Sequence, residues 1–201
     1  QVNNACTSLV NHDMELAEEV RDVEARLNQF EVDLDDRCVS IIAKRQPTAG
    51  DLRAIVSVMK VITDLERIGD EADRIAKMAL DLADSEKPEH QYAEFRAIHA
   101  NVMKMLRRTL DAFARLDVEG ALRVFEDDEN IDRAYNKIVR HSIEAMQSNP
   151  LEVERSVSLM WAARALERIG DHAKNISEYV IYQVKGRDVR HSGLPGELLD
   201  S

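Results

Sequence analysis

Two copies of one hexapeptide decide the fold of this chain: Leu65-Glu66-Arg67-Ile68-Gly69-Asp70 and Leu166-Glu167-Arg168-Ile169-Gly170-Asp171. The similarity continues upstream, where Val56-Ser57-Val58-Met59 returns as Val157-Ser158-Leu159-Met160. Self-similarity at a fixed separation, here about 100 residues, marks a structural unit that occurs more than once. The repeat therefore predicts two copies of one architecture within 201 residues.

The composition indicates a helical protein with an aliphatic core. Hydrophobic residues make up 44% of the chain and charged residues 32%, whereas aromatic residues make up only 4%. That balance is typical of a folded protein with long charged faces. No apolar run of about 18 residues occurs, so we expect no membrane-spanning helix. The net charge of −11 at pH 7 argues against nucleic acid as a partner.

Apolar residues recur at intervals of three and four through five long stretches, which predicts five long helices. Pro47 and Pro150 are expected to end two of them, because a proline disfavours the α conformation of the residue before it. Residues 1–11 are expected to be the end of a further helix, and Gly186 to terminate the last one. The expected long helices cover about residues 14–45, 49–83, 92–116, 118–148 and 151–184.

These helices predict an all-α fold, a tandem repeat of two antiparallel three-helix bundles. The first bundle is expected over residues 1–86, the second over 87–186, and a C-terminal tail over 187–201. The polar stretch 84–88 is expected to separate the bundles. The first helix is about 25 residues long in the second copy but only about 12 in the first. We therefore expect the first helix of the first bundle to be truncated by roughly 15 residues or more.

Each repeat carries two carboxylates four residues apart, Glu66 with Asp70 and Glu167 with Asp171. At about 100° per residue, both pairs fall on a strip beside the apolar face of their helix. Like charges at this spacing repel each other, so they favour a nearby cation or basic neighbour. The glycine before each aspartate predicts the close approach of another backbone, since glycine is unfavourable in a helix interior.

Another helix of each repeat carries a matching pair, Glu24 with Asn28 and Asp128 with Asp132. Four oxygen-bearing side chains from two helices would form a site for a hard cation or for iron. A solvated acidic face is the alternative left open. Arg67 and Arg168 follow the two glutamates in sequence but are expected on another face of the helix, and a charge-rich helix forms such neighbouring pairs by chance.

Other chemistries find less support in the sequence. None of the six histidines has a glutamate three residues before it, as a di-iron centre of the ferritin type requires. His172 is expected to be a surface residue or a support for a neighbouring ligand. Cys6 and Cys38 have no CxxC spacing and are expected to be reduced thiols. Because no phosphate-binding glycine loop or nucleophile elbow occurs, we expect no enzyme activity.

Several motifs match those of a known family. They are Arg45-Gln46-Pro47 with Asp51-Leu52-Arg53, Asp64-Leu65-Glu66-Arg67-Ile68-Gly69-Asp70, Leu166-Glu167-Arg168-Ile169-Gly170-Asp171-His172-Ala173 with Asn175-Ile176, and Val180-Ile181-Tyr182. On these motifs the chain resembles, over about residues 5–186, the PhoU family of accessory proteins of the bacterial phosphate-specific transport system. The family fold is a pair of three-helix bundles. The resemblance implies a cytoplasmic regulator that restrains phosphate uptake and keeps the phosphate-starvation response off when phosphate is plentiful.

The resemblance also implies partners and metal. The partners would be the ATPase subunit of the phosphate ABC transporter and the phosphate-sensing histidine kinase, through which alone the protein would meet the membrane. Family members bind multinuclear metal clusters, which would here contain iron, zinc or another divalent ion. The implied ligands are Glu24, Asn28, Glu66 and Asp70 in one site and Asp128, Asp132, Glu167 and Asp171 in the other, with Asn28 departing from the carboxylate pattern. A metal store or metal-dependent enzyme is the alternative function, and a homodimer is left open.

Overall fold

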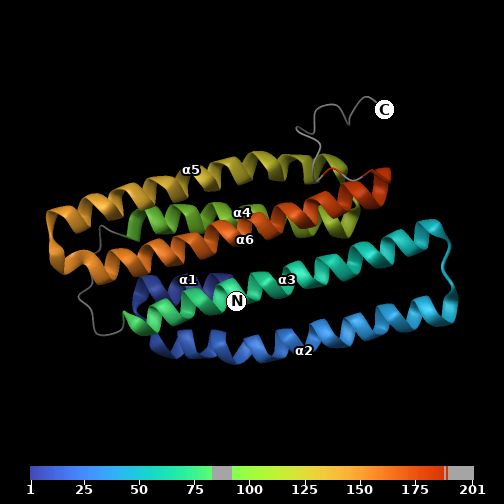
Figure 1. Ribbon diagram of the computed structural model, residues 1–201, viewed down its shortest axis with the longest axis horizontal. Helices are drawn as coiled ribbons and strands as arrows, with labels where there is room; N and C mark the ends of the chain where they lie inside the picture. Colours follow the sequence, from blue (N-terminus) through green and yellow to red (C-terminus); the bar gives the residue numbers. More distant parts are fainter. Residues whose placement is uncertain (83–91, 188, 190–201) are drawn as a thin grey trace.

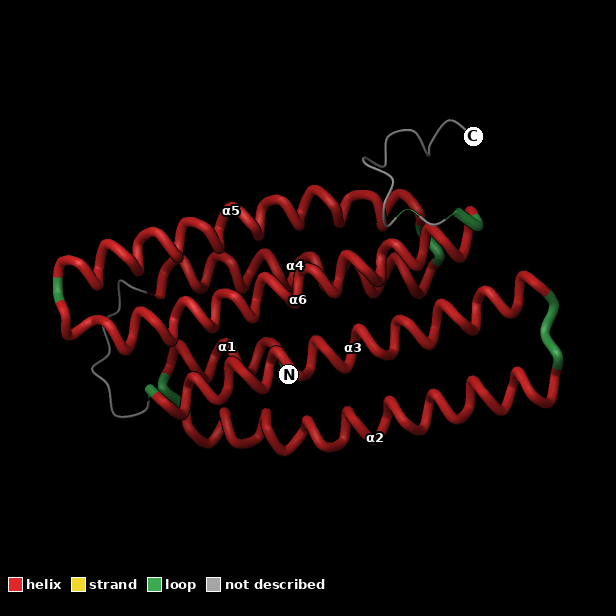
Figure 2. The backbone as a smooth tube through the Cα atoms, in the orientation of Figure 1, coloured by secondary structure: helices red, strands yellow, loops and turns green. Residues whose placement is uncertain are grey.

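Figure 1 shows the protein as a computed structural model that describes residues 1–82, 92–187 and 189. All regular structure in this part of the chain is helical (Figure 2). The elements are α1 (Val2–Asn11), α2 (Met14–Arg45), α3 (Ala49–Asp81), α4 (Tyr92–Arg115), α5 (Val118–Ser148), the 3₁₀ helix η1 (Pro150–Glu152) and α6 (Val153–Lys185). The expected boundary at 84–88 and nearly all of the expected tail at 187–201 lie outside the described residues.

Four helices form one layer of the molecule. Helices α2, α3, α6 and α5 lie side by side in this order, and α1 and α4 pack against the layer and against each other (Figures 1 and 2). Helices α1 to α3 form the first three-helix bundle and α4 to α6 form the second. The bundles meet where α3 runs antiparallel to α6. The predicted fold is confirmed, whereas the residue limits of the two domains stay a prediction.

The same turn begins the second helix of each bundle. Asp13 caps α2 by accepting a hydrogen bond from the Leu16 amide at 3.0 Å, and Asp117 caps α5 by accepting one from the Gly120 amide at 3.0 Å. The residue before each aspartate has a left-handed backbone, with φ of 54° at His12 and 53° at position 116. An aspartate at this position satisfies an amide that the helix itself leaves unpaired. The repeat is thus visible at the level of single hydrogen bonds.

The last helix differs slightly from its expected bounds. The expected helix starts at residue 151, but residues Pro150–Glu152 form a 3₁₀ turn and α6 begins at Val153. The proline lacks an amide hydrogen and is tolerated there because it opens the turn. At the other end, Gly186 has a φ of 72° and ends α6 in the left-handed conformation, as predicted. No helix in the described part of the chain is long and apolar enough to span a bilayer.

The core is aliphatic, as the composition predicts, but it is shorter in the first bundle. Ile75, Leu166 and Ile169 are among its fully buried side chains. Helix α1 has 10 residues where α4 has 24, so it covers only the start of α2. Four apolar residues that belong to the period of three and four along the rest of α2 are therefore exposed: Val23, Phe30, Leu34 and Ile41. Among the described residues, no third helix lies over this face.

Candidate functional site

The second bundle brings together the four carboxylates predicted for it. Asp128 and Asp132 of α5 face Glu167 and Asp171 of α6, and burial followed by mutual repulsion raises the pKa of three of them. The pKa of Glu167 rises to about 7, first through burial and then through Asp171. The pKa values of Asp132 and Asp171 rise through burial and then through Asp128. These residues form one interacting group, which we call the second acidic strip.

Two basic side chains reach the second acidic strip without neutralising it. Lys174 Nζ lies 2.6 Å from Asp128 Oδ2, and Arg164 contacts Glu167 Oε1. The other oxygen of Glu167, Oε2, is buried and has no hydrogen-bond partner among the residues that the structure describes. A buried carboxylate oxygen without a donor is costly, so this position favours an added cation or donor.

The glycine of the second repeat allows α5 and α6 to come close. A methyl group on Gly170 would lie 3.3 Å from Ile131 Cδ1 and 3.8 Å from Asp128 Oδ1. At Gly69 the corresponding atom is Leu27 Cδ2, at 2.2 Å. The atoms nearest to both glycines belong to side chains of the facing helix, so the predicted close approach is made through these side chains. Their role is to make room for apolar side chains of the facing helix.

The first bundle assembles a looser group from the predicted residues. Glu24 of α2 lies near Asp70 of α3, and its pKa is raised by burial and by Asp70, against a hydrogen bond from Gln1 Nε2 at 2.9 Å. The pKa of Glu66 is raised by burial, then by Asp70 and by Glu31. Sequence reasoning missed Glu31, although it lies seven residues after Glu24 and so on the same face of α2.

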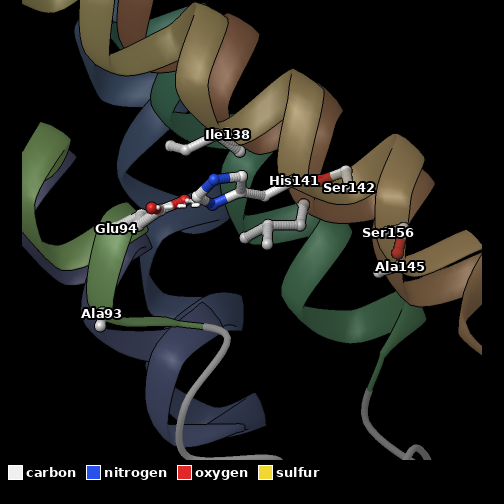
Figure 3. Close-up of a pocket in the computed structure, with 8 residues that line it drawn as sticks. Ala93, Glu94, Ile138, His141, Ser142, Ala145 and Ser156 are labelled. Atoms are coloured by element: carbon white, nitrogen blue, oxygen red, sulfur yellow. Dashed lines mark hydrogen bonds and ion pairs between the residues drawn. The ribbon is translucent and has the colours of Figure 1, made fainter. Parts of the chain in front are cut away.

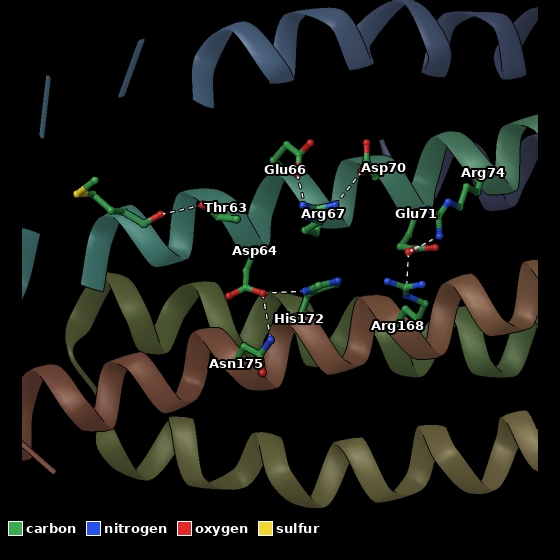
Figure 4. A network of polar contacts seen from close by, with 11 residues as sticks. Thr63, Asp64, Glu66, Arg67, Asp70, Glu71, Arg74, Arg168, His172 and Asn175 are labelled. Atoms are coloured by element: carbon green, nitrogen blue, oxygen red, sulfur yellow. Dashed lines mark hydrogen bonds and ion pairs between the residues drawn. The ribbon is translucent and has the colours of Figure 1, made fainter. Parts of the chain in front are cut away.

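Asn28 and the arginine of the first repeat differ from what the sequence suggested. Asn28 is exposed on α2, so its predicted role as a ligand stays a prediction. Arg67 was expected on another face, but its guanidinium lies 3.5 Å from Glu66 and 3.8 Å from Asp70. The long side chain bends back over the acids on its own helix (Figure 4). Because Arg67 is more than half exposed, this pairing contributes little stability.

The two bundles are joined by buried polar contacts between α3 and α6 (Figure 4). Asp64 Oδ1 accepts hydrogen bonds from Asn175 Nδ2 at 3.1 Å and faces His172 Nδ1 at 2.7 Å. Close by, Arg168 Nε lies 2.9 Å from Glu71 Oε1. The side chain of His172 is only 16% exposed, so the expectation of a surface residue is wrong, whereas a role as support for a neighbouring ligand stays a prediction. His172 holds the bundles together because its partner acid is almost fully buried.

One cavity of about 340 Å³ lies elsewhere in the second bundle, among the ends of α4, α5 and α6 (Figure 3). Ile138 and Leu159 form part of its apolar wall. At its rim Glu94 is held by His141 at 2.9 Å and by Lys137 at 3.0 Å. These rim charges already satisfy one another, so the cavity offers less to a charged ligand than the second acidic strip does.

The structure bears on metal binding in two ways. Within residues 1–82, 92–187 and 189, no group of three or more His, Cys, Asp or Glu side chains is arranged as a ready metal site. The second acidic strip nevertheless fits a hard cation in donor chemistry, since all its ligating atoms would be carboxylate oxygens and Glu167 Oε2 lacks a partner. The residues fit such an ion, whereas its binding stays a prediction.

Comparison with known proteins identifies the family. The family model for the PhoU domain matches residues 1–79 and 95–180 of this chain. The chain belongs to the PhoU family. The resemblance predicted from its repeated motif is thereby confirmed.

Relatives and solved structures of the family are similar over nearly the whole chain. A Pseudomonas putida protein named phosphate-specific transport system accessory protein PhoU homolog is 50% identical over 96% of this chain and 76% of its own length. The Escherichia coli K12 protein named phosphate-specific transport system accessory protein PhoU is 40% identical over 100% of this chain and 82% of its own. The crystal structure of PhoU from Pseudomonas aeruginosa superposes with a TM-score of 0.90 at 45% identity, covering 93% of this chain and 90% of that one.

A more distant PhoU structure has the same fold. The phosphate transport system regulatory protein PhoU from Streptococcus pneumoniae superposes with a TM-score of 0.86 at 28% identity. The match covers 94% of this chain and 88% of that chain. The arrangement of two bundles around α3 and α6 is thus retained at low sequence identity.

Proposed function

We propose that this protein is a cytoplasmic regulator of phosphate uptake and a negative regulator of the phosphate-starvation response. It acts as an adaptor between the ATPase subunit of the phosphate ABC transporter and the phosphate-sensing histidine kinase. The observation that carries the proposal is the similarity, over 96% to 100% of the chain, to proteins named accessory proteins of the phosphate-specific transport system.

The geometry supports a role through surfaces without catalytic turnover. An adaptor needs a rigid body with distinct faces for its partners, and two long bundles fixed to each other by Asp64, His172 and Asn175 supply one. Asp132 and Asp171 of the second acidic strip keep part of their surface in solvent, where a partner can reach them. Such charged faces raise the rate at which an oppositely charged partner is captured.

The direct test is retention of the two partners. The tagged protein is incubated with solubilised membranes that contain the phosphate transporter and the kinase, at low and at high salt. We expect the ATPase subunit and the kinase to be retained at low salt. A tagged helical protein of similar charge serves as the control. Retention of neither partner at low salt would contradict the proposal.

The regulatory part of the proposal needs a cellular readout. A strain that lacks its own accessory protein carries a reporter under a phosphate-starvation promoter and grows with ample phosphate. We expect expression of this chain to lower reporter activity several-fold. Unchanged reporter activity at a confirmed expression level would contradict a role in keeping the response off.

A second candidate function is metal binding at the second acidic strip. The observation that favours it is the unpartnered Oε2 of the buried Glu167. The metal content of the purified protein would be measured for the wild type, for the double variant Glu167→Gln, Asp171→Asn, and for Glu126→Gln as an exposed control on α5. We expect the double variant alone to lose iron, zinc or another divalent ion. Equal metal content in all three proteins would exclude this strip as the metal site.

A further inference from the structure

The start of α6 carries a row of exposed apolar side chains. Val153, Val157 and Trp161 recur every four residues, so they lie along one side of the helix. Trp161, the single tryptophan of the chain, is 62% exposed. Leu151 in the preceding 3₁₀ turn and Ile143 near the end of α5 are exposed as well. A contiguous exposed apolar row that contains a tryptophan is typical of a protein-binding surface.

The same side of α6 leads from this apolar row to the second acidic strip. Asp171 follows Val157 by 14 residues and is therefore turned by only about 40° from it, at a distance of about 21 Å along the axis. Between them Arg164 lies over the ring of Tyr135, with 5.7 Å from its guanidinium carbon to the ring centroid. We call the surface that carries Leu151, Val153, Val157, Trp161, Asp132 and Asp171 the α6 docking face.

The acidic end of the α6 docking face carries more negative than positive charge. Glu167 is only 9% exposed, yet its Oε2 has no hydrogen-bond partner. Together with the three carboxylates around it, Glu167 makes a group of four that is met by two basic side chains, Arg164 and Lys174. Asp132 and Asp171 keep part of their surface in solvent, so an incoming cationic side chain would meet their carboxylates in a net negative field. An anionic membrane surface would be repelled by the same field.

We propose that the α6 docking face binds an amphipathic helix of a partner protein, whose apolar residues cover Val157 and Trp161 and whose arginine or lysine side chains contact Asp171. The inference rests on the proposed adaptor function, for which it names the docking surface. A partner helix of about 18 residues spans the face from one end to the other. Arginine suits the acidic end best, because its planar group can pair with a carboxylate through two parallel hydrogen bonds.

The test uses the full chain and a synthetic amphipathic helix as the probe. The probe has leucines along one side and arginines at one end, and the control peptide has glutamates in place of the arginines. Trp161 reports binding directly, since no other tryptophan contributes to the fluorescence. We expect a saturable blue shift with the arginine peptide that weakens with added salt. The control peptide is expected to give no shift.

Variants locate the binding surface. Binding of the arginine peptide should weaken at least about tenfold in the double variant Glu167→Gln, Asp171→Asn, which loses two charged acceptors. Glu126→Gln, on the opposite side of α5, should bind as the wild type does. With a labelled peptide read by anisotropy, Trp161→Ala should also bind more weakly. Circular dichroism confirms that each variant is folded.

Several results would overturn the proposal. The first two are an equal fluorescence response to both peptides and an unchanged affinity of the double variant for the arginine peptide. The other two are peptide binding that is lost in the presence of a chelator and restored by zinc, and a dimer of the wild-type protein that Trp161→Ala converts to a monomer. The transporter pull-down distinguishes the two proposals. If the wild type and Trp161→Ala retain the transporter equally, the surface is wrong and the adaptor function stands. If the peptide binds but no partner is retained, the adaptor function is wrong and the surface stands.

Discussion

Replacing Glu167 by glutamine is expected to stabilise the protein at neutral and alkaline pH. Burial, and then Asp171, raises the pKa of Glu167 from 4.5 to about 7 in the folded protein. Between pH 4.5 and about pH 7, the carboxyl group of Glu167 is therefore protonated in the folded protein but ionised in the unfolded chain. Stability falls as the pH rises through this window, and above it the charged carboxylate remains a cost. Glutamine keeps the size of the side chain and removes the charge.

The size of the effect follows from the two pKa values. The difference between 4.5 and about 7 corresponds to about 3 kcal/mol as an upper limit. Arg164 lies beside Glu167, and its exposed side chain lets solvent screen the repulsion, so the expected gain is about 1–2 kcal/mol. We therefore expect Glu167→Gln to raise the free energy of unfolding by that amount at about pH 8 and to leave it near the wild-type value at about pH 5.

Urea unfolding followed by far-ultraviolet circular dichroism measures this difference at both pH values. The control is Glu126→Gln, whose exposed side chain on α5 should leave the pH dependence of stability unchanged. The reasoning would be refuted if Glu167→Gln were less stable than the wild type at the higher pH. An equal pH dependence in the variant and in the wild type would refute it as well.

Three further predictions follow from buried contacts. Gly69→Ala should change the free energy of unfolding by less than about 1 kcal/mol, because the half-buried Leu27 that the new methyl group meets can turn aside. Gly170→Ala should lower the free energy of unfolding by about 1 kcal/mol or more, because the Ile131 that its methyl group meets is fully buried. Urea unfolding that ranks the two variants in the opposite order would contradict this reasoning. Asp64→Ala should cost about 1–3 kcal/mol in the same assay, since it leaves two donors of α6 without an acceptor, and a near-zero change would contradict its role between the bundles. Burial raises the pKa of Cys6 and Cys38, so both thiols should react with a thiol reagent much more slowly in the native protein than in urea, and fast native labelling would contradict this.

Much of the fold follows from local signals that the chain carries twice. The aspartates at positions 13 and 117 are N-caps in both copies, and the apolar period of three and four residues defines the long helices. The repeat then requires both halves to form the same bundle. The acidic strips were predicted for the same reason, because Glu66 and Glu167 hold the same place in each copy.

The contacts between the bundles could not be predicted in this way. Asp64 of α3 and His172 of α6 form the pair between the bundles. At the equivalent position of the other repeat, Asp64 is replaced by Ala165 and His172 by Glu71. Comparing the copies therefore hides the pair, because each member is unique to its half. It forms only through tertiary packing, which no local pattern encodes.

The exposed apolar residues of α2 show a different limit. Phe30 lies in the predicted apolar stripe yet is 59% exposed. Periodicity indicates which face of a helix is apolar, but it does not indicate how far a neighbouring helix extends over that face. The ten residues of α1 reach only the start of α2.

The pairing of Asp64 with His172 makes the contact between the bundles heterotypic. If two first bundles met through α3 in the same geometry, each Asp64 would face a Glu71, and like charges would oppose the contact. Two second bundles meeting through α6 would place each His172 opposite Ala165 and lose the acceptor. The duplicated halves have thus become complementary, because the contact that joins them pairs a first bundle with a second bundle and not with a copy of itself.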